Sequence, residues 1–233
     1  MSVALEIKGL HAWYGESHIL HDMNLSVAQG EVVTLLGRNG AGRTTTLRAI
    51  MGLTGRRTGS IKINGVETIA LPTHRIAHFG VGYCPEERAI FSSLSAEENL
   101  LLPPALTAGG MSVSEIYQMF PNLEERRHSQ GTRLSGGEQQ MLAVARILRT
   151  GAKLLLLDEI SEGLAPVIVQ ALARMISTLK QKGYTIVMVE QNFRFAAPLA
   201  DRFYVVEHGQ VVAQFSAAEL STKSAELNEL LGV

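Results

Sequence analysis

The sequence predicts an α/β fold, and three observations predict it. Short apolar runs recur along the 233 residues, and segments with helical periodicity separate them. Hydrophobic residues make up 46% of the chain, which excludes global disorder and allows a sizeable core. The first clear apolar run ends in a glycine-rich segment that leads into a helix, a strand-to-helix turn typical of α/β proteins.

The first third of the chain alternates strands with a helix. Residues 32–36 form an apolar run that predicts a buried strand, and residues 44–51 predict the helix after the glycine-rich segment. Asn64-Gly65 lies among strand-like residues within 60–68, and this pair favours a hairpin because both positions tolerate positive φ. Residues 81–84 predict another short strand.

Strand signals disappear between Glu86 and Arg149. Ser95 and Ser112 are each followed three residues later by glutamate, a capping box that predicts the start of a helix. A third helix is expected over about 138–148. We interpret residues 87–149 as a helical subdomain inserted into a core made of residues 1–86 and 150–233, so that 1–233 form a single domain.

The last third returns to alternating elements. Strands are expected at 154–157, 185–189, 203–206 and 211–212, the last two joined by a turn at His208-Gly209. Pro166 suits the first turn of a helix with one apolar face, and Gly183 suits its end. That apolar face comprises Ile168, Leu172, Met175, Ile176 and Leu179. We expect residues 217–231 to form a polar helix.

Composition excludes several classes of function. Lys and Arg number 21 against 22 Asp and Glu, so bulk charge gives no argument for binding nucleic acid. Cys84 is the single cysteine, which excludes an internal disulfide framework. No apolar run approaches the roughly 18 residues of a membrane span, and no secretory signal is visible, so we expect a cytosolic protein. The seven histidines are scattered along the sequence and carry no metal-site spacing.

The segment from Gly37 to Thr44 nearly fits the phosphate-loop pattern G-x-x-x-x-G-K-[ST]. Glycines let backbone N–H groups approach a phosphate closely, and the following helix adds its positive end. Thr44 is placed to offer a hydroxyl to Mg²⁺. Arg43 stands where the pattern requires lysine; it retains the charge but is planar and longer. We therefore expect nucleotide binding with an altered geometry at the phosphates, and a hydrolysis rate that lysine would raise.

Two further motifs carry a resemblance to a known family. Leu134-Ser135-Gly136-Gly137-Glu138-Gln139 resembles the signature motif of ATP-binding-cassette (ABC) ATPases, and the apolar run 154–157 followed by Asp158-Glu159 resembles their Walker B motif. Their order, phosphate loop, helical insert, signature and Walker B, also matches. The resemblance implies a P-loop NTPase core with a parallel sheet, an N-terminal antiparallel β region and the inserted helical signature subdomain.

The resemblance also implies roles for individual residues. Asp158 would hold Mg²⁺ together with Thr44 and Glu86, and Glu159 would act as general base, with Gln191 at the position of the switch histidine. Tyr14 would stack on adenine. The nucleotide would contact the phosphate loop, the signature motif and two further positions, Tyr14 and Glu86. The loop and signature residues are Gly37, Asn39, Gly40, Ala41, Gly42, Arg43, Thr44, Thr45, Ser135, Gly136, Gly137 and Glu138.

Departures from the common pattern indicate a subfamily. Glu86 in place of glutamine, Gln191 in place of histidine and the run 161–166 resemble the ATPase subunits of branched-chain amino-acid importers and their urea and short-chain amide relatives. Arg43 and Ile160 do not fit that subfamily. The resemblance implies ATP and Mg²⁺ as cofactors and a homodimer or heterodimer with a second ABC ATPase. It further implies two integral-membrane permease subunits, an indirect link to an extracytoplasmic solute-binding protein, and a position on the inner face of the cell membrane.

Two alternatives stay open at this point. The substitutions at Arg43, Ile160 and Gln191 suit a nucleotide-binding switch with little or no turnover, paired with a catalytic partner ATPase. A cassette ATPase of DNA repair or translation is a third hypothesis, which the single cassette and the absence of a basic tract disfavour. The sequence does not identify the transported solute.

Overall fold

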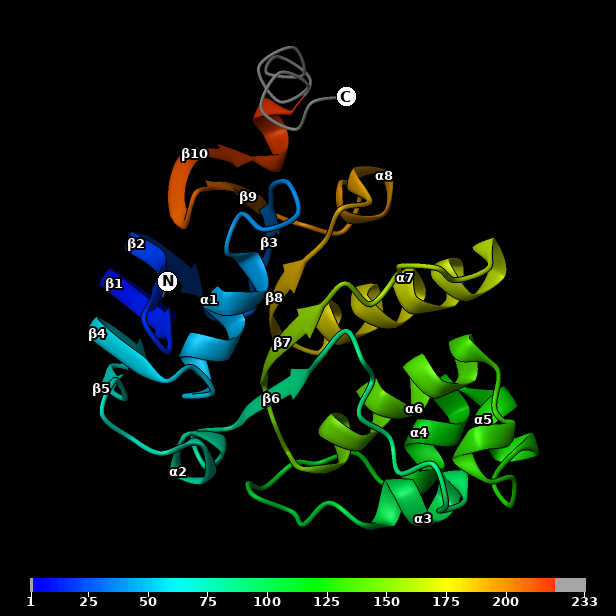
Figure 1. Cartoon of the computed structure of the whole chain (residues 1–233). Coiled ribbons are helices and arrows are strands. Elements are labelled where there is room, and N and C mark those ends of the chain that lie inside the picture. Colours follow the sequence, from blue (N-terminus) through cyan, green and yellow to red (C-terminus); the bar gives the residue numbers. More distant parts are fainter. Residues whose placement is uncertain (1, 221–233) are drawn as a thin grey trace.

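A computed structural model describes residues 2–220 of the chain. Figure 1 shows an antiparallel sheet beside a larger, mostly parallel sheet, with a group of helices α3–α6 on the opposite side of the molecule. Within the described residues, no helix is both long and apolar enough to cross a membrane.

The ten strands of residues 2–220 divide between the two sheets. The first sheet has the order β2-β1-β4-β5 and the second β10-β9-β3-β8-β7-β6, with only β10 antiparallel to its neighbour. The strands are β1 Val3–Tyr14, β2 Ser17–Ala28, β3 Val32–Leu36, β4 Arg56–Ile63, β5 Val66–Glu67, β6 Val81–Cys84, β7 Leu154–Asp158, β8 Thr185–Val189, β9 Arg202–Glu207 and β10 Gln210–Ser216.

The helices follow the capping and turn signals of the sequence. Ser95 and Ser112 both form complete capping boxes at the starts of α3 and α4, as expected. The elements are α1 Arg43–Ile50, α2 Thr73–Ala77, α3 Ala96–Leu101, α4 Val113–Met119, α5 Pro121–Glu125, α6 Gly136–Arg149, α7 Pro166–Gln181 and α8 Phe193–Ala196. Two short 3₁₀ helices, η1 Gly131–Arg133 and η2 Ala217–Glu219, complete the set.

The parallel sheet separates two hydrophobic cores because successive side chains of a strand point to opposite faces. In β7, Leu155 and Leu157 join the core that α6 and α7 cover, whereas Leu154 and Leu156 join the core shared with α1 and the antiparallel sheet. Both faces of the strand are therefore buried, which explains its uninterrupted apolar run.

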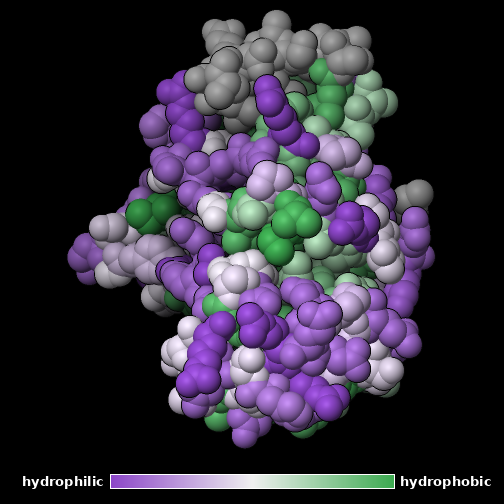
Figure 2. All heavy atoms as spheres, turned by 90° about the vertical axis from the view of Figure 1, so that its right-hand side faces the viewer, coloured by the Kyte–Doolittle hydropathy of each residue, from purple (hydrophilic) through white to green (hydrophobic). Residues whose placement is uncertain are grey.

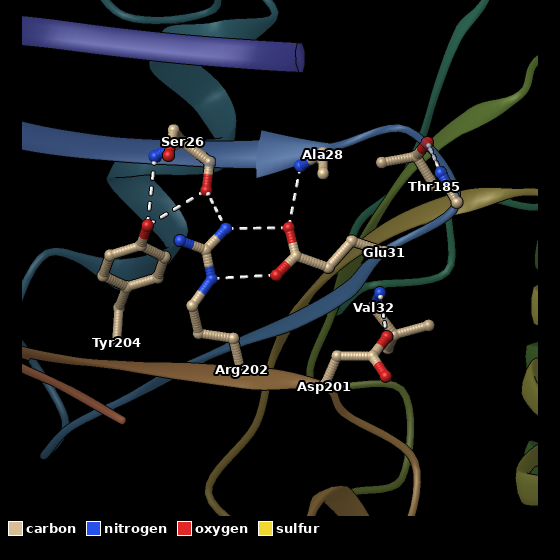
Figure 3. A network of polar contacts seen from close by, with 9 residues as sticks. Ser26, Ala28, Glu31, Val32, Thr185, Asp201, Arg202 and Tyr204 are labelled. Atoms are coloured by element: carbon tan, nitrogen blue, oxygen red, sulfur yellow. Dashed lines mark hydrogen bonds and ion pairs between the residues drawn. The ribbon is translucent and has the colours of Figure 1, made fainter. Parts of the chain in front are cut away.

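A polar network joins the two sheets (Figure 3). Arg202 at the start of β9 forms two hydrogen bonds to the Glu31 carboxylate, at 2.8 and 2.7 Å, and also donates to the backbone oxygen of Ser26 in β2. The Tyr204 hydroxyl donates to the same oxygen at 3.0 Å. The network ties the end of β2 to the start of β9, so it holds the antiparallel sheet against the parallel sheet.

Most of the expected elements lie where the sequence placed them. The strands expected at 32–36, 81–84 and 185–189 are present with those bounds, and Asn64-Gly65 turns the chain between β4 and β5 with φ of 49° and 80°. The sequence pattern did not indicate β1 and β2, which only the family resemblance implied. The polar helix expected at 217–231 begins as η2, and its residues from 221 onward lie outside the described residues.

Three histidines that looked scattered in the sequence lie together on the antiparallel sheet. The His11 and His18 rings approach to 3.1 Å between Nδ1 and Nε2, and the His18 ring lies between those of Trp13 and His21, at centroid distances of 4.2 and 3.9 Å. Irregular register between β1 and β2 brings these side chains to one face. Their spacing along the sequence did not indicate this cluster, because the three residues come from two strands that pair in the fold.

Candidate functional site

The segment between β3 and α1 forms the wall of a cavity of about 410 Å³. Gly37 has φ of 151°, and a Cβ there would lie 2.3 Å from the Val206 carbonyl oxygen, so the loop can only turn here with glycine. Gly42 caps α1 with φ of 104°, and a Cβ there would lie 2.9 Å from Leu20 Cδ2. Lining residues include Tyr14, Asn39, Gly40, Ala41, Gly42, Arg43, Thr44, Thr45, Glu86, Glu159 and Gln191.

Besides the phosphate loop, the cavity collects residues from four other regions of the chain. Tyr14 comes from the end of β1, Glu86 follows β6, Glu159 follows β7, and Gln191 lies just after β8. The carboxyl ends of adjacent parallel strands meet at one edge of a sheet, where open α/β sheets bind ligands. The cavity thus brings together most of the residues that the sequence proposed for nucleotide and metal binding. Gly37 and Asp158 do not line it, although Asp158 accepts a hydrogen bond from Thr44, which does, and the signature residues lie elsewhere.

Arg43 lies on the floor of this cavity, and its side chain is only 4% exposed. Nη1 donates to the Glu190 backbone oxygen at 2.9 Å, and Nη2 donates to Glu159 Oε1 at 3.0 Å and to Asn39 Oδ1 at 3.3 Å. Burial lowers the pKa of Arg43, while the nearby carboxylates raise it. The residue that replaces the expected lysine is therefore bonded to the chain's own acceptors.

Glu159 is held at both of its carboxylate oxygens. Oε1 accepts from Arg43, and Oε2 accepts from the Gln191 side-chain amide at 2.7 Å. Its backbone φ is 47°, an uncommon conformation for a residue other than glycine, which is maintained where the surroundings require it. Burial raises the pKa of Glu159, and its bonds to Gln191 and Arg43 oppose that rise.

Asp158 faces the start of α1 and is fully buried. Its Oδ1 accepts from the Thr44 hydroxyl at 3.0 Å, and its Oδ2 accepts from the Tyr83 hydroxyl at 3.1 Å. Burial raises the pKa of Asp158 to about 6, although the two hydroxyls lower it. Hydroxyl and carboxylate oxygens are the ligands that Mg²⁺ prefers, so the donor set of Thr44, Asp158 and the nearby Glu86 suits this ion.

Glu190 is a functional candidate that the sequence reasoning missed. Its side chain is 1% exposed, and both carboxylate oxygens bind Ser161, one through the hydroxyl at 2.8 Å and one through the backbone N–H at 3.2 Å. Burial raises the pKa of Glu190 to about 7. The contact connects the segment after Glu159 with the segment that carries Gln191. Its position between the strand 185–189 and Gln191 was the only sequence signal.

The signature residues form the start of α6 and do not line this cavity. Ser135 caps the helix through a complete capping box with Glu138. Gly137 lies against α7, because a Cβ there would be 2.7 Å from Ile168 Cγ1. Ser135 is exposed, Gly136 and Glu138 are half-buried and Gly137 is buried, and the four form a helix tip that does not line the phosphate-loop cavity of the same chain.

Figure 2 shows the side of the molecule on which α7 begins, with hydrophobic side chains gathered in the middle of a hydrophilic face. Val167 in the first turn of α7 is 65% exposed. Leu164 and Pro166 line a second cavity that also includes Glu159 and Gln191. Ile160, for which the sequence offered no explanation, is 1% exposed and packs in the core beneath this segment.

The family model described as ABC transporter matches residues 20–162. The chain belongs to this family. It is 40% identical to the high-affinity branched-chain amino acid transport ATP-binding protein BraG of Pseudomonas aeruginosa over 231 residues, covering 98% of this chain and 99% of that protein. It is 34% identical to the lipopolysaccharide export system ATP-binding protein LptB of Escherichia coli K12, covering 93% and 92%.

Solved structures of ABC cassettes have the same fold. The ATP-binding subunit of an ABC transporter matches with a TM-score of 0.81 and 30% identity, covering 99% of this chain and all of that one. The ADP- and Pi-bound dimeric cassette MJ0796 matches with a TM-score of 0.80 and 24% identity, covering 91% and 98%. The expected P-loop ABC fold is confirmed, and the chain is an ABC transporter ATPase.

Proposed function

We propose that this chain is the ATP-hydrolysing motor subunit of an importer for branched-chain or related amino acids. Its 40% identity to BraG extends over almost the whole of both chains and carries this proposal. The exporter subunit LptB is less similar, at 34%. The departures from the common ABC pattern at Glu86 and Gln191 also favour the importer subfamily.

The cavity supplies the groups that ATP binding requires. Backbone N–H groups from Asn39 to Thr45 would cradle the phosphates, with the positive end of α1 behind them. Tyr14 is 36% exposed beside the loop, where its ring can stack on adenine. Thr44, Asp158 and Glu86 would hold Mg²⁺, which neutralises charge on phosphate oxygens when bound.

Glu159 and Gln191 would carry the chemistry. The Glu159 carboxylate would accept a proton from the attacking water, and its bonds to Arg43 and Gln191 fix where the two oxygens lie. The Gln191 amide can donate to Glu159 or to a phosphate oxygen, but it cannot take a proton. The general base is therefore assigned to Glu159 alone.

A second ATPase subunit would complete the site. The tip of α6, with Ser135, Gly136, Gly137 and Glu138, is a helix N-terminus suited to an anion, yet it does not line the cavity of its own chain. We infer that it meets the nucleotide held by a homologous or identical partner. The apolar side chains around Val167 favour a packed contact on that side.

The wider assembly follows from the family. We propose that two membrane permease subunits bind this ATPase on the inner face of the cell membrane, and that a solute-binding protein acts indirectly through them. The switch with little turnover remains the second candidate, since the bond from Arg43 to Glu159 occupies one oxygen of the assigned base.

Phosphate release from purified protein tests the ATPase assignment. We expect turnover with ATP and Mg²⁺ well above that of Glu159→Gln, because the variant keeps the size and shape of the side chain but loses the base. Equal rates, with intact nucleotide binding, would favour the switch. For the solute, uptake of labelled leucine, isoleucine and valine is measured in cells that lack the gene and in cells that regain it. Unchanged uptake of all three would contradict the importer proposal.

A further inference from the structure

The Arg43 guanidinium donates hydrogen bonds to three separate parts of the chain, and we call this set of three bonds the brace. Its acceptors are the backbone oxygen of Glu190 after β8, the carboxylate of Glu159 after β7 and the amide oxygen of Asn39 in the phosphate loop. Arg43 and Glu159 are 4% and 8% exposed, so bulk water competes little for this ion pair. A backbone oxygen is a fixed acceptor, and it anchors the guanidinium against the sheet.

Lysine could not reproduce this arrangement. A guanidinium presents five N–H donors over a rigid plane, whereas an ammonium offers three donors from a single atom on a shorter side chain. Arg43 donates through Nη1 to Glu190 and through Nη2 to Glu159, so two different atoms hold two different strand ends. Arginine in place of lysine at position 43 therefore changes which groups of its own chain the phosphate loop contacts.

The brace leaves donors for a ligand. Among residues 2–220, the three bonds leave the Nε–H and one Nη1–H of Arg43 without a protein acceptor. Arg43 lines the cavity, and two of its N–H donors are not used by the bonds to Glu159, Glu190 and Asn39. A phosphate that reached these donors could bind without the guanidinium leaving Glu159.

We propose that Arg43 is a positioning residue for Glu159: it keeps the carboxylate fixed at the cavity wall while nucleotide is bound. The inference rests on the proposed function, since it assigns how the base of that same site is held. Gln191 holds the other oxygen of Glu159 from the opposite side. Two side chains, Arg43 and Gln191, therefore orient the base. A phosphate loop with the standard lysine would lack the first of them.

Arg43→Lys tests this assignment because it retains the positive charge and removes the brace. We expect the dissociation constant of a fluorescent ATP analogue to change by no more than about threefold, since charge and backbone cradle remain. We expect kcat to fall about 10- to 100-fold, the size of effect that a misplaced catalytic group produces. Two neutral variants extend the test: Arg43→Gln can still donate a hydrogen bond, whereas Arg43→Met cannot. Arg43→Gln should therefore retain a higher kcat than Arg43→Met.

Three comparisons complete the design. Arg174→Lys makes the same chemical change at an exposed position on α7 and should alter neither quantity. In a Glu159→Gln background, Arg43→Lys should cause no further loss of the residual turnover, because the base it positions is gone. Thermal unfolding of each variant confirms that the measured samples are folded.

The outcomes separate the hypotheses. Weaker nucleotide binding by more than about tenfold with unchanged kcat would overturn the inference and make Arg43 a phosphate ligand only. A rise in kcat would overturn it in the other direction, because the guanidinium would then restrain the base. If the unsubstituted protein bound no nucleotide, the proposed function itself would fail, and the comparison of variants would not be reached.

Discussion

Glu190→Gln should stabilise the protein at high pH and leave it unchanged at low pH. Glu190 is 1% exposed, and burial raises its pKa from 4.5 to about 7. A neutral carboxyl group and a glutamine amide have nearly the same shape, and each offers one acceptor and at least one donor to Ser161. The variant therefore mimics the protonated form at every pH.

The expected magnitude follows from the two pKa values. Folding favours the protonated form of Glu190. The stability that this protonated group contributes is therefore fully present below pH 4.5 and is lost as pH rises through about 7. A shift of about 2.5 pKa units corresponds to about 3 kcal/mol of unfolding free energy. The difference between the variant and the unsubstituted protein should be below about 1 kcal/mol at pH 5 and reach about 3 kcal/mol at pH 8.

Guanidinium chloride unfolding at several pH values between 5 and 8, without nucleotide, measures this difference. Taking the variant minus the unsubstituted protein at each pH cancels the other titrating groups. Glu125→Gln makes the same change on the exposed surface of α5 and is the matched control. The reasoning would be refuted if the stability difference for Glu190→Gln did not change with pH, or if the variant were less stable than the unsubstituted protein at pH 8. Either result would mean that the charged Glu190 carboxylate does not destabilise the folded protein.

Three further tests probe the frame of the site. Arg202→Met leaves the partly buried Glu31 carboxylate without its cation. The free energy of unfolding, measured by denaturant titration at pH 7, should therefore fall by about 3 kcal/mol. Gly37→Ala drives a Cβ against a backbone oxygen and should cost several-fold more stability than Gly183→Ala, whose φ of 77° is strained but whose surroundings are open; calorimetry of both compares them. Ser135→Ala and Ser112→Ala each remove a helix cap and should cost about 1 kcal/mol, but only Ser135→Ala should also slow ATP turnover.

Local features of the chain were predictable because neighbouring residues determine them. Capping boxes at Ser95 and Ser112, the hairpin at Asn64-Gly65 and the apolar run of β7 all depend on side chains within a few positions of one another. The phosphate loop, signature and Walker B motifs were recognisable for the same reason. β1 and β2 gave no clear pattern, since irregular register breaks the alternation of buried and exposed residues along both strands.

The partners of buried charges depended on the tertiary structure. Arg43 and Glu159 are 116 positions apart, and they meet only because the loop after β3 and the end of β7 open on the same edge of the sheet, with β8 between the two strands. The sequence alone led us to expect faster hydrolysis with lysine at position 43, whereas the bond to Glu159 leads us to propose slower hydrolysis. The pairing of Glu190 with Ser161 and the gathering of three histidines have the same origin. The amino-acid order specifies which groups are present and the local turns, whereas strand order and close packing decide which of those groups meet away from water.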